Sequence, residues 1–161
     1  MKKKFNDEDA RLVSRAVSIA EDGLKHGGGP FGALIKRGDM IIAESYNKVT
    51  ILSDPTAHAE ILAIRKACEV VGSHDLSDCT IYSSCEPCPM CLGAIYWAGI
   101  KKVYYGSVRD DAASAGFDDD YIYKELEHNP EQRDLFFCRV DEIDSNRVFR
   151  KWEKMEDKTT Y

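Results

Sequence analysis

The first part of the chain carries apolar residues at steps of three and four, the spacing that places them on one face of an α-helix. This pattern covers residues 7–26, and the run Gly27-Gly28-Gly29-Pro30 ends it. The apolar positions are Leu12, Val13, Ala16, Val17, Ile19, Ala20 and Leu24. The sequence therefore predicts an amphipathic helix at the start of the fold.

Shorter apolar runs bounded by turn residues predict β-strands. The first two runs are joined at Gly38-Asp39, a pair that favours a hairpin turn. The five predicted strands cover residues 31–36, 40–46, 79–83, 102–106 and 135–140.

Helix-like segments separate the later strands. Asp54 and Pro55 have the form of an N-cap and a first helical residue, which predicts a helix over residues 54–71. Residues 47–53 before it are expected to form a loop. Further helices are predicted at residues 89–98, 110–115, 121–126 and 144–155.

An initial hairpin followed by alternating strands and helices is typical of layered α/β domains. We therefore expect a three-layer α/β/α sandwich with a mixed five-stranded sheet. A length of 161 residues suits a single domain covering 1–161. Residues 141–161 are then a C-terminal helix and tail.

The composition and net charge limit which partners the chain is expected to bind and in which compartment it is expected. The formal net charge of −6 argues against a nucleic-acid partner, because such surfaces usually carry a basic excess. The basic start Lys2-Lys3-Lys4 turns acidic where a signal peptide needs apolar residues, and no apolar run approaches the ~20 residues of a membrane span. Six cysteines then favour metal-bound or free thiols. These features predict a cytoplasmic protein with no membrane partner.

Two short motifs carry the candidate chemistry. His58-Ala59-Glu60 lies in a predicted helix, and Pro87-Cys88-Pro89-Met90-Cys91 follows a predicted strand. A catalytic zinc site usually takes three protein ligands and leaves one position for water. His58, Cys88 and Cys91 are the candidate ligands of one Zn²⁺ per chain. The two cysteines are three residues apart at a helix start, where free N–H groups stabilise thiolates.

Glu60 is the candidate proton carrier. Zinc brings the pKa of a bound water to roughly 7, and a nearby carboxylate can take the proton released. Glu60 would deliver that proton to a ring nitrogen and then to a leaving amine. The predicted reaction is attack of a zinc-activated water on an amidine-like ring carbon, with loss of ammonia.

Each motif also has a structural explanation. Cys88-x-x-Cys91 alone could be a redox pair, and His58 alone could be a capping or core histidine. A structural zinc site needs a fourth ligand, and no second C-x-x-C or H-x-H pair follows downstream. An iron–sulfur run starting at Cys85 would require a cysteine where Ile95 stands. The combination His-x-Glu with Pro-Cys-x-x-Cys, in this order, is the signature of zinc deaminases that act on nucleobases.

On these motifs the chain resembles the cytidine-deaminase-like superfamily, and within it the bacterial guanine deaminases. The similarity runs over nearly the whole chain. The zinc motifs and Pro30-Phe31-Gly32-Ala33 are shared with tRNA adenosine deaminases and cytosine deaminases, and so indicate the superfamily. The stretches that look specific to guanine deaminases are Ile95-Tyr96-Trp97-Ala98 and Ala115-Gly116-Phe117-Asp118-Asp119.

The resemblance implies hydrolysis of guanine to xanthine and ammonia in purine salvage or catabolism. Phe31 would then stack on the purine, Asn47 would hydrogen-bond the ring edge, and the backbone N–H of Ala59 would donate to a ring acceptor. Trp97 would close the pocket. The alternative is a tRNA adenosine deaminase, or a deaminase of cytosine or another nucleobase.

The resemblance also implies roles near the C-terminus. Asp119, or Asp118 beside it, would bind the N–H groups of guanine and assist proton transfer; the alternative is a solvated acidic turn. The segment 141–161 would cover the active site and bring Tyr161 to it; the alternative is a frayed terminus. The family forms homodimers, which implies one here.

Overall fold

The computed structural model describes residues 5–161. Its helices and strands are α1 (Asp7–Lys25), β1 (Gly32–Arg37), β2 (Met40–Tyr46), α2 (Val49–Leu52), α3 (Ala59–Val71), β3 (Cys79–Cys85), α4 (Pro89–Trp97), β4 (Lys102–Ser107), α5 (Arg109–Ser114), α6 (Asp120–Glu127), the 3₁₀ helix η1 (Pro130–Gln132) and α7 (Arg147–Glu153). The chain divides into two compact units, with the boundary between Asp120 and Tyr121.

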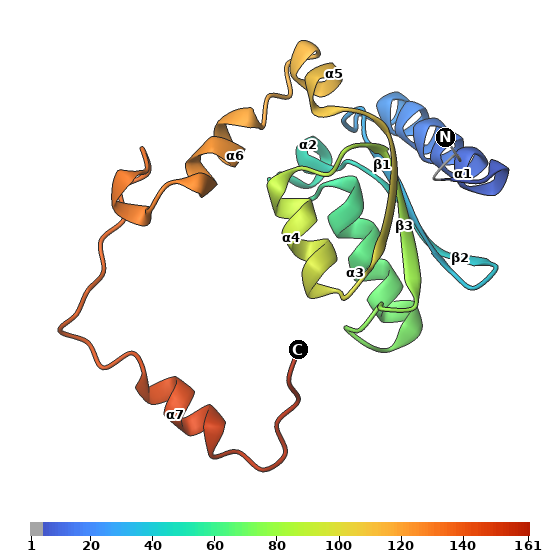
Figure 1. The fold of residues 1–161 in the computed structure, drawn as a ribbon. Helices are drawn as coiled ribbons and strands as arrows, with labels where there is room; N and C mark the ends of the chain where they lie inside the picture. The colour runs from blue at the N-terminus through green and yellow to red at the C-terminus, as the bar shows by residue number, and fades with distance from the viewer. Residues whose placement is uncertain (1–4) are drawn as a thin grey trace. The chain divides into compact units, whose positions relative to one another are not determined.

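The first unit is built on one sheet with the strand order β2-β1-β3-β4. The strands β1, β2 and β3 are labelled in Figure 1. The predicted hairpin joins β1 and β2, which pair antiparallel, and its turn places Gly38 at a φ of 56°. β1 also pairs antiparallel with β3, whereas β3 and β4 run parallel. The parallel pair is connected by α4, so the carboxyl ends of β3 and β4 lie at the same edge of the sheet.

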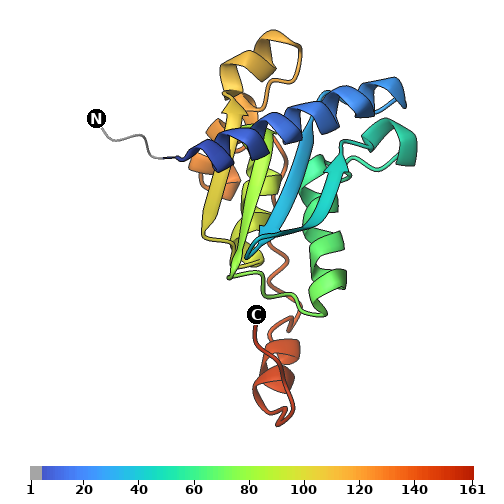
Figure 2. The ribbon, with the colours of Figure 1, turned by 90° about the vertical axis from the view of Figure 1, so that its right-hand side faces the viewer.

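Helices cover both faces of this sheet. Figure 2 shows α1 crossing one face, with α3 and α4 on the other. The predicted amphipathic character of α1 explains its place, because its buried Ala16 and Ala20 belong to the apolar stripe. Gly32 of β1 packs against this helix so closely that an added Cβ would lie 2.2 Å from the Ala16 carbonyl oxygen. The three-layer sandwich expected from the sequence is confirmed.

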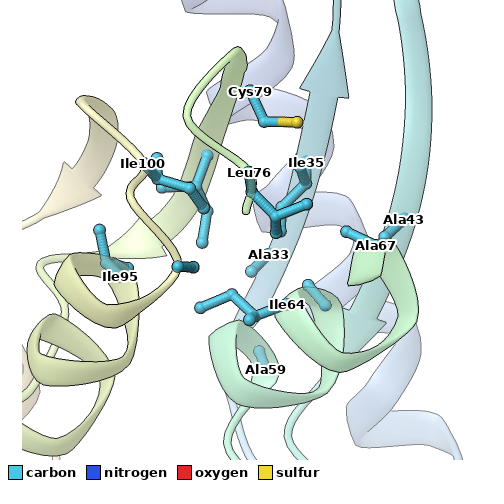
Figure 3. Packing of buried hydrophobic residues seen from close by; sticks show 13 residues of the cluster. Ala33, Ile35, Ala43, Ala59, Ile64, Ala67, Leu76, Cys79, Ile95 and Ile100 are labelled. Atoms are coloured by element: carbon cyan, nitrogen blue, oxygen red, sulfur yellow. The ribbon is translucent and has the colours of Figure 1, made fainter. Parts of the chain in front are cut away.

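The main core lies between the sheet and the α3–α4 layer (Figure 3). Small alanines of α3, among them Ala59 and Ala67, face Ala33 and Ile35 of β1, and Ile95 of α4 completes the cluster. Small residues allow α3 to approach the strands closely. This packing fixes the amino ends of α3 and α4, and those ends carry the zinc motifs.

The sheet has four strands rather than the expected five. Residues 135–140 belong to the second unit and form no strand in the described chain. Their side chains are largely exposed, with Phe136 at 88%. A short apolar run becomes a strand through packing against neighbouring strands, and this run has no such neighbour within its own unit. The second unit does contain the predicted helices, as α6 and α7.

The helix predicted at residues 54–71 begins later than expected. Asp54 does not cap it: its carboxylate accepts hydrogen bonds from the backbone N–H and the hydroxyl of Thr56, which forms a local turn. Helix α3 starts at Ala59, with His58 at the N-cap position. The expected loop at residues 47–53 also contains the single-turn helix α2. The residues before His58 therefore form a turn, and His58 stands at the start of the helix that follows it.

None of the helices in the described part of the chain has the length and apolar character needed to cross a membrane. The basic start Lys2-Lys3-Lys4, which resembles a signal peptide, lies outside the described residues, whereas the acidic residues that follow it belong to the first turn of α1.

Candidate active site

Two helix starts bring the predicted zinc ligands together. His58 is the N-cap residue of α3, and Cys88 is the N-cap residue of α4, with Cys91 in the first turn after it. Pro89 occupies the first turn of α4, where the absence of an N–H costs nothing. Both helices thus direct free N–H groups, and the positive ends of their dipoles, toward the same point.

The spacing of the three side chains fits a tetrahedral metal ion. The Nδ1 atom of His58 lies 3.5 Å from the Sγ atoms of Cys88 and Cys91. With Zn–N and Zn–S bonds of about 2.0 and 2.3 Å, tetrahedral geometry requires an N–S separation of about 3.5 Å. All three ligand atoms lie within 4.8 Å of one another, and no other such set of three occurs within residues 5–161.

The three side chains of the trio shift one another's pKa values. A hydrogen bond from the Cys91 thiol, together with His58, lowers the pKa of Cys88 to about 4. The same hydrogen bond and burial raise the pKa of Cys91, while the Cys88 sulfur raises the pKa of His58. Two thiols here compete for one negative charge. A divalent cation removes that competition, because both can then ionise.

Glu60 lies directly beside this trio. Its side chain is only 5% exposed, and burial raises the pKa of its carboxyl group. The Ser83 hydroxyl donates to Oε1 over 2.6 Å, and the Cys91 thiol lies 3.4 Å from Oε2. A buried carboxyl group with a raised pKa, next to a metal site, has the properties of a general base and acid.

A cavity of about 270 Å³ opens onto His58, Glu60 and Cys88. One wall is aromatic: the rings of Phe31 and Phe117 meet edge to face, with centroids 5.0 Å apart and planes at 88°. Two perpendicular rings form a corner that can hold the face and the edge of a planar heterocycle.

The lining of the cavity also carries acidic side chains. These belong to Asp118, Asp119 and Glu86, with Arg109 as the one guanidinium among the lining residues. Burial raises the pKa of Asp119, and the nearby Cys88 sulfur adds to this. Glu86 accepts a hydrogen bond from the backbone N–H of Arg109 over 3.4 Å. It thereby connects the zinc-motif loop to the segment that leads to Asp119.

The remaining predicted contact residues are Asn47, Ala59, Trp97 and Tyr161. Asn47 is buried, and its backbone N–H donates to the Phe31 carbonyl over 2.9 Å, so it lies beside the aromatic wall. Ala59 is the first residue of α3, where a backbone N–H has no acceptor within the helix. Trp97 ends α4, at the opposite end from Cys88, and is 69% exposed. Tyr161 belongs to the second unit.

Sequence reasoning missed four residues of this site: Ser83, Glu86, Arg109 and Phe117. Phe117 stands in a stretch that resembles guanine deaminases, but its ring could not be assigned to the aromatic wall from the sequence alone. Ser83 gave one weak signal, as a hydroxyl in a short strand otherwise expected to be buried. Glu86 and Arg109 are 23 residues apart, and nothing local predicts their contact.

Comparison with known proteins agrees with this geometry. Residues 6–107 match the family described as the cytidine and deoxycytidylate deaminase zinc-binding region. The chain is 51% identical to a guanine deaminase from Bacillus subtilis, over 93% of this chain and 97% of that protein. It is 35% identical to a tRNA-specific adenosine deaminase from Rickettsia bellii, over 86% of this chain and 98% of that one.

Among solved structures, the Bacillus subtilis guanine deaminase superposes with a TM-score of 0.92 at 50% identity, covering 98% of this chain and 99% of that one. A guanine deaminase from Nitrosomonas europaea gives a TM-score of 0.66 at 31% identity, covering 71% of this chain and 66% of that one. The zinc-ligand trio and these similarities agree, and the chain belongs to the cytidine and deoxycytidylate deaminase zinc-binding family.

Proposed function

We propose that this chain hydrolyses guanine to xanthine and ammonia, as a zinc-dependent aminohydrolase of purine salvage or catabolism. The observation that carries the proposal is Glu60 beside the trio of His58, Cys88 and Cys91, in a cavity with an aromatic corner and acidic lining residues. The similarity to guanine deaminases over nearly the whole chain supports guanine as the base.

His58, Cys88 and Cys91 would hold the zinc ion. When bound there, zinc supplies Lewis acidity that lowers the pKa of water toward neutrality. Two thiolates balance its charge, and the converging starts of α3 and α4 stabilise those thiolates.

Glu60 moves the protons in the proposed reaction. Its Oε2 atom faces the ligand side of the cavity, next to Cys91, and accepts the proton of the attacking water. Glu60 then gives that proton to the ring nitrogen next to the attacked carbon, takes up the second proton of the former water, and gives it to the departing amine, which leaves as ammonia. The raised pKa of its carboxyl group suits this role, because a carboxyl group with a low pKa would not hold the proton between the two transfers.

The cavity walls would recognise the purine. Phe31 and Phe117 offer a face and an edge for the ring, and Asn47 and the N–H of Ala59 would bind ring acceptors. Asp119 would accept hydrogen bonds from guanine, whose ring N–H and exocyclic amine are donors. Conversion of Asp119 to Asn should therefore weaken turnover of guanine.

The second candidate is a tRNA adenosine deaminase, because relatives with that name share the zinc motifs. The net charge of −6 argues against it, since tRNA binding depends on neutralising phosphates with Lys and Arg. We also propose a cytoplasmic location. Within residues 5–161, no disulfide joins any of the six cysteines, which are Cys68, Cys79, Cys85, Cys88, Cys91 and Cys138, and this agrees with a reducing compartment.

We extend the proposal to the C-terminal unit and to a homodimer. Segment 141–161 would cover an active site in the working enzyme, with Tyr161 closing the pocket over the base. The apolar side chains of this unit support the proposal, because Phe136, Ile143 and Phe149 are more than half exposed and need a surface to cover them. Conversion of Tyr161 to Ala should raise KM for guanine. Light scattering tests the proposed homodimer by measuring the molar mass in solution.

The test is ammonia release by the zinc-loaded protein from guanine, guanosine, adenine, cytosine and cytidine, with an adenosine-containing tRNA anticodon stem-loop as a sixth substrate. Selective release from guanine supports the proposal. Release from cytosine or the RNA instead would keep the zinc chemistry and overturn the assignment of the substrate.

A further inference from the structure

Ser83 is a buried polar residue that the proposed reaction does not yet use. It lies in β3 between two paired strands, opposite Ala33 of β1 and Tyr105 of β4, and its relative exposure is 0%. The strand ladder uses its backbone groups, so its hydroxyl is available to another residue. A hydroxyl in such a place is costly unless it is hydrogen-bonded.

The partner of this hydroxyl is Glu60. The Ser83 Oγ atom donates to Glu60 Oε1 over 2.6 Å, a length typical of a hydrogen bond to a charged acceptor. Oε2, the other oxygen, lies toward Cys91, 3.4 Å from its sulfur. The terminal torsion of a glutamate is broad and otherwise weakly restricted. The hydrogen bond from a central strand therefore fixes the orientation of the carboxylate, with one oxygen on Ser83 and the other toward the zinc ligands.

We propose that Ser83 is a positioning residue for the deamination reaction: it fixes Oε1 of Glu60, so that Oε2 is the oxygen that carries the proton. The inference rests on the proposed function. Ser83 acts through Glu60 and makes no contact with the base. Its role is separate from holding the metal, since His58, Cys88 and Cys91 do not depend on its hydroxyl.

The first test compares Ser83→Ala with Ser84→Ala as a matched control. Ser84 is also buried and its hydroxyl also makes one hydrogen bond, but it accepts that bond, from the Gly32 N–H over 3.0 Å, and does not contact Glu60. We expect Ser83→Ala to lower kcat by about 10- to 100-fold with KM for guanine nearly unchanged. Ser84→Ala should leave kcat within about threefold of the parent, although its Tm falls. Zinc content should stay at the parental level in both.

A double-mutant cycle separates positioning from general damage. In a Glu60→Gln background the proton carrier is gone, so adding Ser83→Ala should change the residual rate by less than about threefold. Ser83→Thr keeps the hydroxyl on a β-branched residue suited to a strand, and should recover most of kcat.

Three results would overturn the inference: equal losses for Ser83→Ala and Ser84→Ala, an equal loss in both backgrounds, or parental kcat in Ser83→Ala. If the added methyl group lowers the stability of Ser83→Thr, the cycle still decides the question. A parent protein that releases no ammonia from guanine contradicts the proposed function itself, and is thereby distinct from a failure of this inference.

Discussion

Replacing Glu60 with Gln changes one atom at the centre of the proposed reaction and leaves its surroundings almost intact. The amide oxygen can still accept the hydrogen bond from Ser83, and the three zinc ligands keep their positions. Glu60 is 5% exposed and burial raises its pKa, so loss of its charge removes no solvated ion pair. We expect the free energy of unfolding to change by no more than about 1 kcal/mol.

The effect on catalysis should be much larger. A positioned general base or acid typically contributes about 10²- to 10⁴-fold to the rate. At about 1.4 kcal/mol for each factor of ten, this corresponds to about 3–5 kcal/mol of transition-state stabilisation. The expected loss is in kcat, because Glu60 acts on the water and on the leaving amine rather than on binding of the base.

The assay measures initial rates of ammonia release from guanine, together with zinc content and thermal unfolding of the same preparations. Glu44→Gln is the matched control, because Glu44 lies on β2 away from the cavity and pairs with Arg15. It should retain parental kcat. If Glu60→Gln retains more than a tenth of parental kcat while binding zinc normally, Glu60 is not the proton carrier and the reasoning is refuted.

Three further predictions follow from the same site. Ser83→Ala should move the acid limb of the kcat/KM–pH profile to higher pH, because Glu60 must be ionised to act and the Ser83 hydrogen bond lowers the pKa of its carboxyl group; a limb that stays in place or moves to lower pH contradicts this. Dialysis against a chelator should abolish ammonia release and lower Tm, with recovery on adding zinc. Cys91→Ala should not recover, whereas the exposed Cys138→Ala should behave as the parent. Phe117→Ala should raise KM for guanine by about tenfold, since stacking on an aromatic ring contributes about 1–3 kcal/mol per base; an unchanged KM would remove Phe117 from the binding wall.

The metal ligands could be predicted because their positions depend on local sequence. Cys88 and Cys91 are separated by one helical turn that starts at Pro89, and His58 lies two residues from Glu60. Residues at such spacings stay together in any fold that keeps the helix starts. The layers of the sandwich were predictable for a similar reason, since they follow from the period of the apolar residues.

Contacts between distant segments were not predictable in this way. The partners of Phe31 and Glu60, which are Phe117 and Ser83, are set by strand order and by the approach of α5 to the cavity. The prediction of a strand at residues 135–140 was wrong for a related reason. An apolar run forms a strand only when another strand lies beside it, and apolar character alone does not provide that neighbour. Asp54 shows that a local pattern can also mislead, because its side chain stabilises a turn and does not cap a helix.

The most direct test of the central claim is hydrolysis of guanine by the zinc-loaded protein in water enriched in oxygen-18, with xanthine and ammonia measured from the same sample. The account predicts equal amounts of xanthine and ammonia, one heavy oxygen atom in each xanthine molecule, and a rate at least about 100-fold lower in the Glu60→Gln variant under the same conditions. Guanine left unchanged by a protein that holds zinc at His58, Cys88 and Cys91 would contradict it.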